Sequence, residues 1–459
     1  MDHFADTAQF PVWHAANVSP PRCSPAPSHS EVDVAIVGGG FSGLWTAYYL
    51  LKAQPQLRVA LFESRNVGFG ASGRNGGWCS GFFPLSVAEL ATVYGPDAAQ
   101  LAYRESFATL AEISRVISEE RIECGWHVGG TLQSASTSLQ AHRLQTQLAQ
   151  QHQAGLSTND ALWLSATEVG KHIAVAETHG AIYSPHCATV NPFQLVHGLA
   201  NSVQALGATI WEHSKVLSIN DGIVTHEHGQ CRAQLVVQAT EGYSHALRQT
   251  RRRIVPLYSL MVATEPLDAA TVEQLHWHGR STFNDGSNMV IYAQLTADNR
   301  IAFGGRGAPY HYGSRIREQY DIHDQTHELI VKSIARHFPQ AAHARITHRW
   351  GGPLAVPRDW TPSIELRRSD RYARLGGYVG DGVAATNLFA RTLVDVYLDR
   401  DTPRRNLPFV HHQSRRWEVE PLRFLGINAL IGLSNSIDTY EQRHGRTPRL
   451  RSRVLHALL

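Results

Sequence analysis

The stretch VDVAIVGGGFSG, residues 32–43, decides the fold class. Its apolar beginning predicts a short buried strand, its glycines predict a tight turn, and Leu44 to Ala53 predicts a helix. A second apolar run, Leu57 to Phe62, predicts another strand that ends at Glu63. Strand, turn, helix and strand in this order predict a βαβ unit of the Rossmann type.

Gly38, Gly40 and Gly43 have the spacing of a dinucleotide-binding turn. The first glycine permits the tight turn, the second lets the backbone approach a pyrophosphate, and the third lets the helix pack close to the strand. The N–H groups at the helix N-terminus then face the phosphates. Glu63 lies where a carboxylate accepts hydrogen bonds from ribose hydroxyls and repels a 2′-phosphate. These features disfavour NADP but do not distinguish FAD from NAD.

Four further motifs decide for a flavin. They are GASGRNGGW (70–78), LVVQATEGYSH (235–245), RWGGPLAVP (349–357) and LGGYVGDGVAATNL (375–388). Together with residues 38–43 and Glu63 they resemble the D-amino-acid oxidase (DAO) family of FAD-dependent oxidoreductases, over roughly residues 32–400. Within that family, the sequence before Pro353 looks most like the γ-glutamylputrescine oxidases and related amine oxidases.

The resemblance implies that FAD is the cofactor and that glycine turns and the start of a helix surround it. The helix that follows Gly380 would present its N-terminus to the flavin, which is anionic when reduced. The cofactor-binding residues expected from the motifs are Gly38, Gly40, Phe41, Ser42, Gly43, Glu63, Ser64, Arg65, Ala71, Ser72, Arg74, Asn75, Gly76, Gly77, Trp78, Val216, Ala239, Thr240, Gly380, Asp381, Gly382 and Val383.

The expected fold class is α/β. A Rossmann-type, glutathione-reductase-like FAD-binding domain carries an inserted α+β substrate domain, built on a mostly antiparallel sheet. At 459 residues the chain is long enough for two such cores. The expected division is an N-terminal arm (1–30), a discontinuous FAD-binding domain (31–110, 186–250 and 350–405), a substrate domain (111–185 and 251–349) and a C-terminal helical extension (406–459).

The flavin is expected to be bound non-covalently. Covalent members of the family attach it to a histidine in the glycine-rich segment, and the matching position here is Arg74. Other members use a cysteine near the segment that resembles residues 349–357, whereas this chain has no cysteine after Cys231.

The substrate is expected to be a small amine. D-amino-acid and glycine oxidases carry an arginine before the proline of a G-x-R-P stretch, where it pairs with the substrate carboxylate. The matching residue here is Gly352, although Arg306 or Arg358 could supply a replacement charge. Alternatives that stay open are a D-amino-acid or N-methyl-amino-acid oxidase, and a flavin dehydrogenase with an acceptor other than oxygen.

The reaction expected from the resemblance is hydride transfer to the flavin, hydrolysis of the imine and reoxidation by oxygen to give hydrogen peroxide. The cofactor carries the difficult step, so no catalytic side chain is assigned. The candidate substrate-binding residues are Trp78, Trp360 and Tyr378, as walls of a dry pocket that favours the neutral amine, and Asp381, as a partner for its cation. For each of the four, packing or helix capping is an equally good interpretation.

Composition excludes several other classes. The net charge of +3 is too small to indicate a nucleic-acid partner, and the basic tail from Arg443 to Arg453 is interpreted as solvated surface. No apolar run approaches the ~20 residues of a membrane span. The first thirty residues lack the features of a secretory signal, which predicts a cytoplasmic protein. The 26 histidines form no ligand pattern, so no metal is expected, and the oligomeric state is not indicated.

Overall fold

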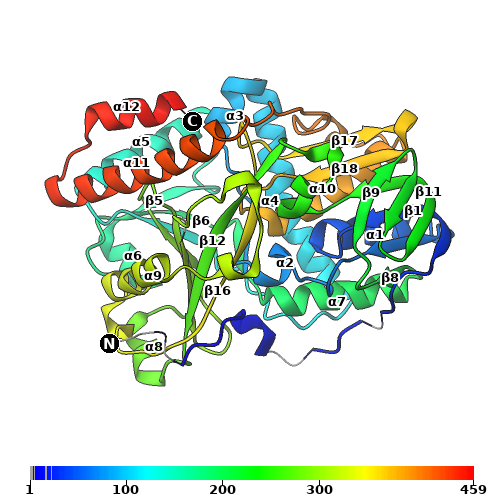
Figure 1. The fold of residues 1–459 in the computed structure, drawn as a ribbon. Coiled ribbons are helices and arrows are strands. Elements are labelled where there is room, and N and C mark those ends of the chain that lie inside the picture. Colours follow the sequence, from blue (N-terminus) through cyan, green and yellow to red (C-terminus); the bar gives the residue numbers. More distant parts are fainter. Residues whose placement is uncertain (1–3, 5, 16–17, 22, 306, 459) are drawn as a thin grey trace.

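The computed structural model describes residues 4, 6–15, 18–21, 23–305 and 307–458. Two eight-stranded sheets lie side by side, and each has its own hydrophobic core (Figure 1). The predicted fold class is therefore confirmed: one unit is a largely parallel sheet covered by helices, and the other is a mostly antiparallel sheet.

The first sheet has the strand order β17-β18-β11-β1-β2-β8, with the β9–β10 hairpin attached to β11. Its central pairs are parallel, and only β17 and the hairpin run antiparallel. The second half of β1 is buried on both faces, because α1 (Phe41–Ala53) packs on one face and the β9–β10 hairpin on the other. The strands are β1 (His29–Val37), β2 (Val59–Phe62), β8 (Thr209–Trp211), β9 (Val216–Asn220), β10 (Ile223–His226), β11 (Gly229–Gln238), β17 (Ser363–Arg367) and β18 (Tyr372–Gly376).

The second sheet has the order β16-β12-β15-β14-β13-β4-β6-β5, and only the β13–β4 pair is parallel. β16 pairs with β12 along its length, so the expected domain boundary at residue 350 falls inside a strand of this sheet. The strands are β4 (Thr131–Ser134), β5 (Leu162–Leu164), β6 (Ala181–Ser184), β12 (Ile254–Thr264), β13 (Thr282–Asp285), β14 (Ile291–Leu295), β15 (Ile301–Gly305) and β16 (Ile346–Pro357). A separate pair is β3 (Trp78–Ser80) with β7 (Cys187–Thr189).

The helices follow the predicted periodicity closely, with one break. The sequence from Val87 to Glu120 has the periodicity of one long helix, but it forms two. Gly95 has φ +88° and Pro96 starts the second helix. The helices are α1 (Phe41–Ala53), α2 (Ala71–Arg74), α3 (Val87–Tyr94), α4 (Pro96–Glu119), α5 (Ser138–Gln153), α6 (Ala166–His172), α7 (Pro192–Ala205), α8 (Ala269–Leu275), α9 (Asp324–His337), α10 (Gly382–Tyr397), α11 (Leu422–His444) and α12 (Arg449–Leu458).

The described part of the N-terminal arm lies against both sheets. It contains a short 3₁₀ turn, η1 (Val12–Ala15), and its last two residues already belong to β1. Ala8 forms a parallel bridge with His348 at the edge of the second sheet, and Ser24 does so with Trp211 at the edge of the first. Residues 1–3, 5, 16–17 and 22 of the expected arm lie outside the described residues.

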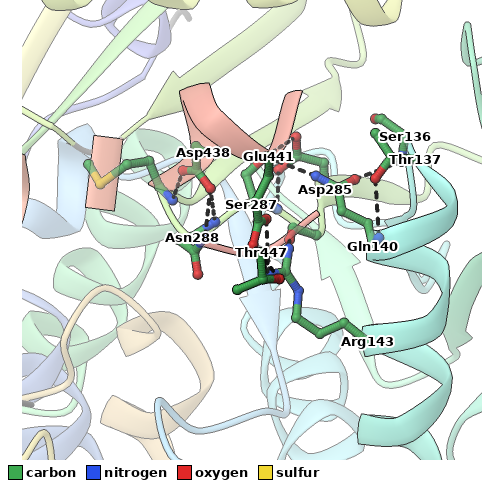
Figure 2. A network of polar contacts seen from close by, with 12 residues as sticks. Ser136, Thr137, Gln140, Arg143, Asp285, Ser287, Asn288, Asp438, Glu441 and Thr447 are labelled. Carbon is green, nitrogen blue, oxygen red and sulfur yellow. Dashed lines mark hydrogen bonds and ion pairs between the residues drawn. The ribbon is translucent and has the colours of Figure 1, made fainter. Parts of the chain in front are cut away.

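The C-terminal extension lies over α5 as a pair of helices (Figure 1). α11 lies within the expected helical extension, and the basic tail expected as solvated surface forms α12, whose described side chains are mostly exposed. Asp438 of α11 accepts hydrogen bonds from the backbone N–H groups of Asn288 and Met289 at 2.9 and 2.8 Å. Figure 2 shows this contact beside the ion pair between Glu441 and Arg143, whose N and O atoms lie 3.2 Å apart. The extension thus fixes a loop after β13 and one residue of α5.

Neither a membrane helix nor a metal cluster is found in the described ranges. No helix there combines the length and apolar character that crossing a bilayer requires. The same residues contain no group of three or more His, Cys, Asp or Glu side chains placed to hold a metal ion.

Candidate functional site

Two cavities meet at the carboxyl edge of the first sheet. One, the nucleotide cleft, has a volume of about 1010 Å³ and runs along the ends of β1, β2 and β11. The other, the inter-sheet cavity, has a volume of about 1350 Å³ and opens between the second sheet and α10. Both are lined by Ala71, Arg74, Asn75, Leu354, Gly380 and Val383. Ligands of open parallel sheets bind at this edge.

The glycine turn after β1 leaves no room for side chains. A Cβ on Gly38, whose φ is +119°, would lie 2.4 Å from Ala239 O. A Cβ on Gly43 would lie 2.1 Å from Gly38 O, so only glycine lets α1 start this close to the turn. Ser72 of α2 accepts a hydrogen bond from the Phe41 N–H at 2.8 Å. The turn and α2 therefore form one surface of backbone and small side chains, which suits a close approach by a pyrophosphate.

Glu63 closes the far end of the nucleotide cleft. Its Oε2 accepts a hydrogen bond from Gly39 N–H, and its Oε1 accepts one from Arg65 N–H, both at 2.9 Å. Burial raises the pKa of Glu63 above its usual range, while these N–H donors oppose that rise. The carboxylate lies beside the glycine turn, where its oxygens can accept hydrogen bonds from the ribose hydroxyls of an adenine dinucleotide.

α10 begins at the place where the two cavities join. Its first residue is Gly382, and Asp381 is the N-cap residue, without a capping hydrogen bond from its side chain. The turn before the helix is fastened by Glu241, whose carboxylate accepts hydrogen bonds from the N–H groups of Gly377 and Tyr378 at 2.9 and 3.2 Å. Burial raises the pKa of Glu241 to about 7. The α10 N-terminus is thus presented to the site, as the sequence predicts.

The expected cofactor-binding residues lie around the two joined cavities, and different residues line each cavity. Most of them line the nucleotide cleft, whereas Gly76, Trp78 and Asp381 line only the inter-sheet cavity. Gly43 and Gly77 line neither cavity. Both are needed for packing, since a Cβ on Gly77 would lie 2.4 Å from Val190 O.

The candidate substrate residues divide in the same way. Trp78, Trp360 and Asp381 line the inter-sheet cavity. Tyr378 lines the nucleotide cleft instead, and its hydroxyl is hydrogen bonded to Ser42 Oγ at 2.9 Å. Tyr378 therefore lies between α1 and the start of α10, and its carbonyl oxygen accepts a hydrogen bond from the Asp381 N–H at 3.1 Å.

The structure describes one of the two arginines considered as replacement charges. Arg306 lies outside the described residues. Arg358 forms an ion pair with Glu418 at 3.2 Å, lies over the ring of Trp417 and lines neither cavity.

Arg74 is the cation that does reach the site. It lines both cavities, and its Cδ lies 3.6 Å from where a Cβ on Gly352 would be. Its guanidinium pairs with Asp321 at 2.5 Å and also donates to Gly351 O at 3.2 Å. Burial raises the pKa of Asp321 to about 6, against the opposing effect of Arg74. Sequence reasoning assigned Arg74 to the flavin but gave no signal for this partner.

The far wall of the inter-sheet cavity is polar, which the sequence did not reveal. α5 contributes Arg143, Gln147, Gln150 and Gln151 to it. Within the described chain, Trp78 Nε1 and Asn284 Oδ1 are buried without a hydrogen-bond partner, and both residues line this cavity. A donor and an acceptor of this kind suit a ligand with a polar group beyond its reacting end. The glutamine-rich sequence of α5 was the signal that could have indicated this polar wall.

Comparisons with known proteins agree with this geometry. The sequence model of the FAD-dependent oxidoreductase family DAO matches residues 33–396. The chain is 28% identical over 383 residues to a probable oxidoreductase, OrdL, of Haemophilus influenzae, covering 81% of this chain and 84% of that protein. It is 27% identical to the γ-glutamylputrescine oxidoreductase of Escherichia coli, covering 79% and 83% of the two chains. The structure of glycine oxidase from Geobacillus kaustophilus superposes with a TM-score of 0.70 at 21% identity, over 83% of this chain and 99% of that one.

Proposed function

The chain belongs to the DAO family of FAD-dependent oxidoreductases, and from this premise we propose that it oxidises an amine that lacks a carboxylate on the reacting carbon. In this proposal FAD is held non-covalently. Oxygen is the electron acceptor and hydrogen peroxide the second product. The amine end of the substrate enters the inter-sheet cavity from the side of α5.

The residues of the nucleotide cleft would hold FAD in an extended form. The glycine turn at Gly38 and the N-terminus of α1 would hold the pyrophosphate, and Glu63 the adenosine ribose. Ala71 to Trp78 and the start of α10 would surround the flavin ring. When bound, FAD supplies the acceptor for a hydride from the carbon that carries the nitrogen. In this assignment the discontinuous segments 31–110, 186–250 and 350–405 are the FAD unit.

The observation that carries the proposal is the position of Gly352. It lines the inter-sheet cavity at the place where the resemblance to amino-acid oxidases leads one to expect an arginine. Among the described residues, Arg74 is a cation beside Gly352, and it is already paired with Asp321. A substrate carboxylate would have to displace Asp321 to gain a bidentate partner, which disfavours α-amino acids.

The polar far wall supports a substrate with an amide or similar group at some distance from the amine. The unpartnered Asn284 Oδ1 can accept a hydrogen bond from an amide N–H, and the glutamine side chains of α5 can solvate a longer tail. The Escherichia coli relative is named for γ-glutamylputrescine, which is an acylated diamine. An N-acylated diamine is therefore the substrate class that the cavity fits best.

The aromatic residues of the cavity have a separate task. An alkylamine with a pKa of ~10 must lose a proton before hydride transfer, at a cost of roughly 4 kcal/mol at pH 7. Trp78 and Trp360 line the cavity where the amine would bind, and a dry aromatic wall disfavours the ammonium form. Asp381 lies on the same wall and would attract the cation on entry.

The test is a substrate screen that follows loss of the flavin's visible absorbance without oxygen. N-acylated diamines and simple diamines should bleach the flavin, whereas glycine, sarcosine and D-amino acids should do so slowly. Air is then admitted. Rapid return of colour with peroxide supports an oxidase, and slow return would replace that part of the proposal with a dehydrogenase. Bleaching only by amino acids would overturn the substrate class.

A further inference from the structure

The backbone that leaves α2 is held by side chains from three distant parts of the chain. The carbonyl groups of residues 74–76 each accept one hydrogen bond. Trp350 Nε1 donates to the first at 2.8 Å, Trp13 Nε1 to the second at 2.9 Å, and Gln294 Nε2 to the third at 2.6 Å. The donors come from β16, the N-terminal arm and β14, so the second sheet and the arm converge on this short segment.

Trp13 is a packed part of the structure although it lies in the arm. Its side chain is only 3% exposed, and its ring meets that of Trp350 edge-on with centroids 6.2 Å apart. It belongs to a small cluster that includes Met261 of β12. Ala8 ties the preceding residues of the arm to β16, since its N–H donates to Thr347 O at 2.9 Å.

Holding a carbonyl also fixes the N–H group of the same peptide, because the peptide is planar and the two groups point in opposite directions. Two of these N–H groups are used inside the segment. The Asn75 N–H donates to Ala71 O at 2.9 Å, and the Gly77 N–H donates to Asn75 Oδ1 at 2.8 Å. The N–H between them is that of Gly76, which lines the inter-sheet cavity. This N–H is in the same peptide as Asn75 O, the carbonyl oxygen that Trp13 holds.

We propose that Trp13 is a positioning residue for the flavin: by holding Asn75 O, it aims the Gly76 N–H at the polar edge of the bound cofactor. The N-terminal arm is then part of the FAD site, although it lies outside the part of the chain that matches the family. The inference rests on FAD binding and not on the amine substrate. If the proposed amine substrate proves wrong, the role of Trp13 in FAD binding is therefore unaffected, and the reverse also holds.

The experiment compares Trp13→Phe with the wild-type holoenzyme. Phenylalanine keeps an aromatic ring at this position and removes the N–H together with part of the indole ring. We expect FAD to dissociate about tenfold faster on dilution, equivalent to about 1.4 kcal/mol. We also expect a lower reduction potential, since a donor that favours the reduced, anionic flavin is misplaced. Phe10→Leu is the matched control, because Phe10 is a 48% exposed aromatic residue of the same arm. It should change neither quantity.

A pair of truncations gives an independent test. Removing residues 1–9 deletes the Ala8 bridge but keeps Trp13, whereas removing residues 1–15 deletes both. The shorter deletion should retain FAD as the wild type does, and the longer one should release it at least as fast as Trp13→Phe. The proposal is overturned if Trp13→Phe and the longer deletion both keep the wild-type release rate and potential. It is also overturned if the two deletions weaken FAD binding equally, because the arm would then act through packing at Ala8.

Discussion

The Arg74 guanidinium and the Asp321 carboxylate form an ion pair of 2.5 Å between α2 and the 3₁₀ turn η5 (Glu318–Asp321) of the other unit. Both side chains are mostly buried, at 14% and 16% exposure. The pair lies beside Gly352 and engages Arg74, so a substrate carboxylate at that place would have to compete with Asp321 for this cation. It therefore links substrate choice to the contact between the two units.

Asp321→Asn should release this arginine for a carboxylate. We expect KM for a small α-amino acid to fall about tenfold, because one charge-assisted hydrogen bond contributes about 1.5–3 kcal/mol and Asn retains part of the competing contact. KM for an amine without a carboxylate should stay the same or rise. Steady-state kinetics with both substrates measure the change. Glu318→Gln serves as the control, since Glu318 pairs with exposed Arg65 in the same turn. An unchanged ratio of the two KM values would show that Arg74 does not determine which substrate is selected.

Gly38→Ala should weaken FAD binding. The added Cβ would lie 2.4 Å from Ala239 O on a backbone with φ +119°, so the turn must move. We expect FAD binding to weaken at least tenfold, about 1.4 kcal/mol or more, measured as flavin content and dissociation constant.

The matched control for that substitution is Gly426→Ala in α11. A Cβ there meets no atom within 4 Å of the described structure. Because alanine favours a helix interior, this variant should keep its FAD and gain up to about 1 kcal/mol in free energy of unfolding. Equal FAD retention by the two alanine variants would contradict the role given to the turn.

The free energy of unfolding should decrease as the pH rises from mildly acidic to mildly alkaline, because of Glu241. Its pKa is raised from 4.5 to about 7, so the folded protein holds this proton more tightly than the unfolded chain does. The resulting stabilisation is complete below pH 4.5 and is lost as the pH rises through about 7. Glu241→Gln should flatten this part of the curve of melting temperature against pH. Glu31→Gln, at a 66% exposed side chain, should leave the curve unchanged. A Glu241→Gln curve parallel to the wild type would show that the loss has another origin.

All flavin should leave the polypeptide on acid precipitation. The position where covalent family members carry a histidine is Arg74, and the described structure places its guanidinium on Asp321. None of the five cysteines follows Cys231 in the sequence, so the segment near Gly352 contains no thiol. The supernatant should therefore hold the entire yellow colour, as FAD. Colour that stays with the washed pellet would show a covalent bond.

Local sequence patterns were sufficient for the parts of the site that local chemistry determines. The turn at Gly38 and the start of α10 follow from glycine spacing and strand–helix alternation. The break at Gly95 could also have been read, since glycine followed by proline ends one helix and starts another.

Contacts between distant segments were not predictable in this way. Arg74 and Asp321 are 247 residues apart, and Trp13 and Asn75 are joined across 62. Such pairs depend on how the two sheets are placed, which no local pattern encodes. Tyr378 was misplaced for the same reason. The tip of a strand can face either cavity, and packing between α1 and α10 selects the nucleotide cleft.

The most direct test of the account is a comparison of two substrates that differ by one carboxylate. N-acetylputrescine and Nδ-acetylornithine share the amide and the chain, and only the second carries a carboxylate on the carbon beside the free amine. Anaerobic stopped-flow reduction of the bound flavin gives a rate and an apparent Kd for each. The account predicts that N-acetylputrescine reduces the flavin at least tenfold more efficiently. Equal or faster reduction by Nδ-acetylornithine would contradict it.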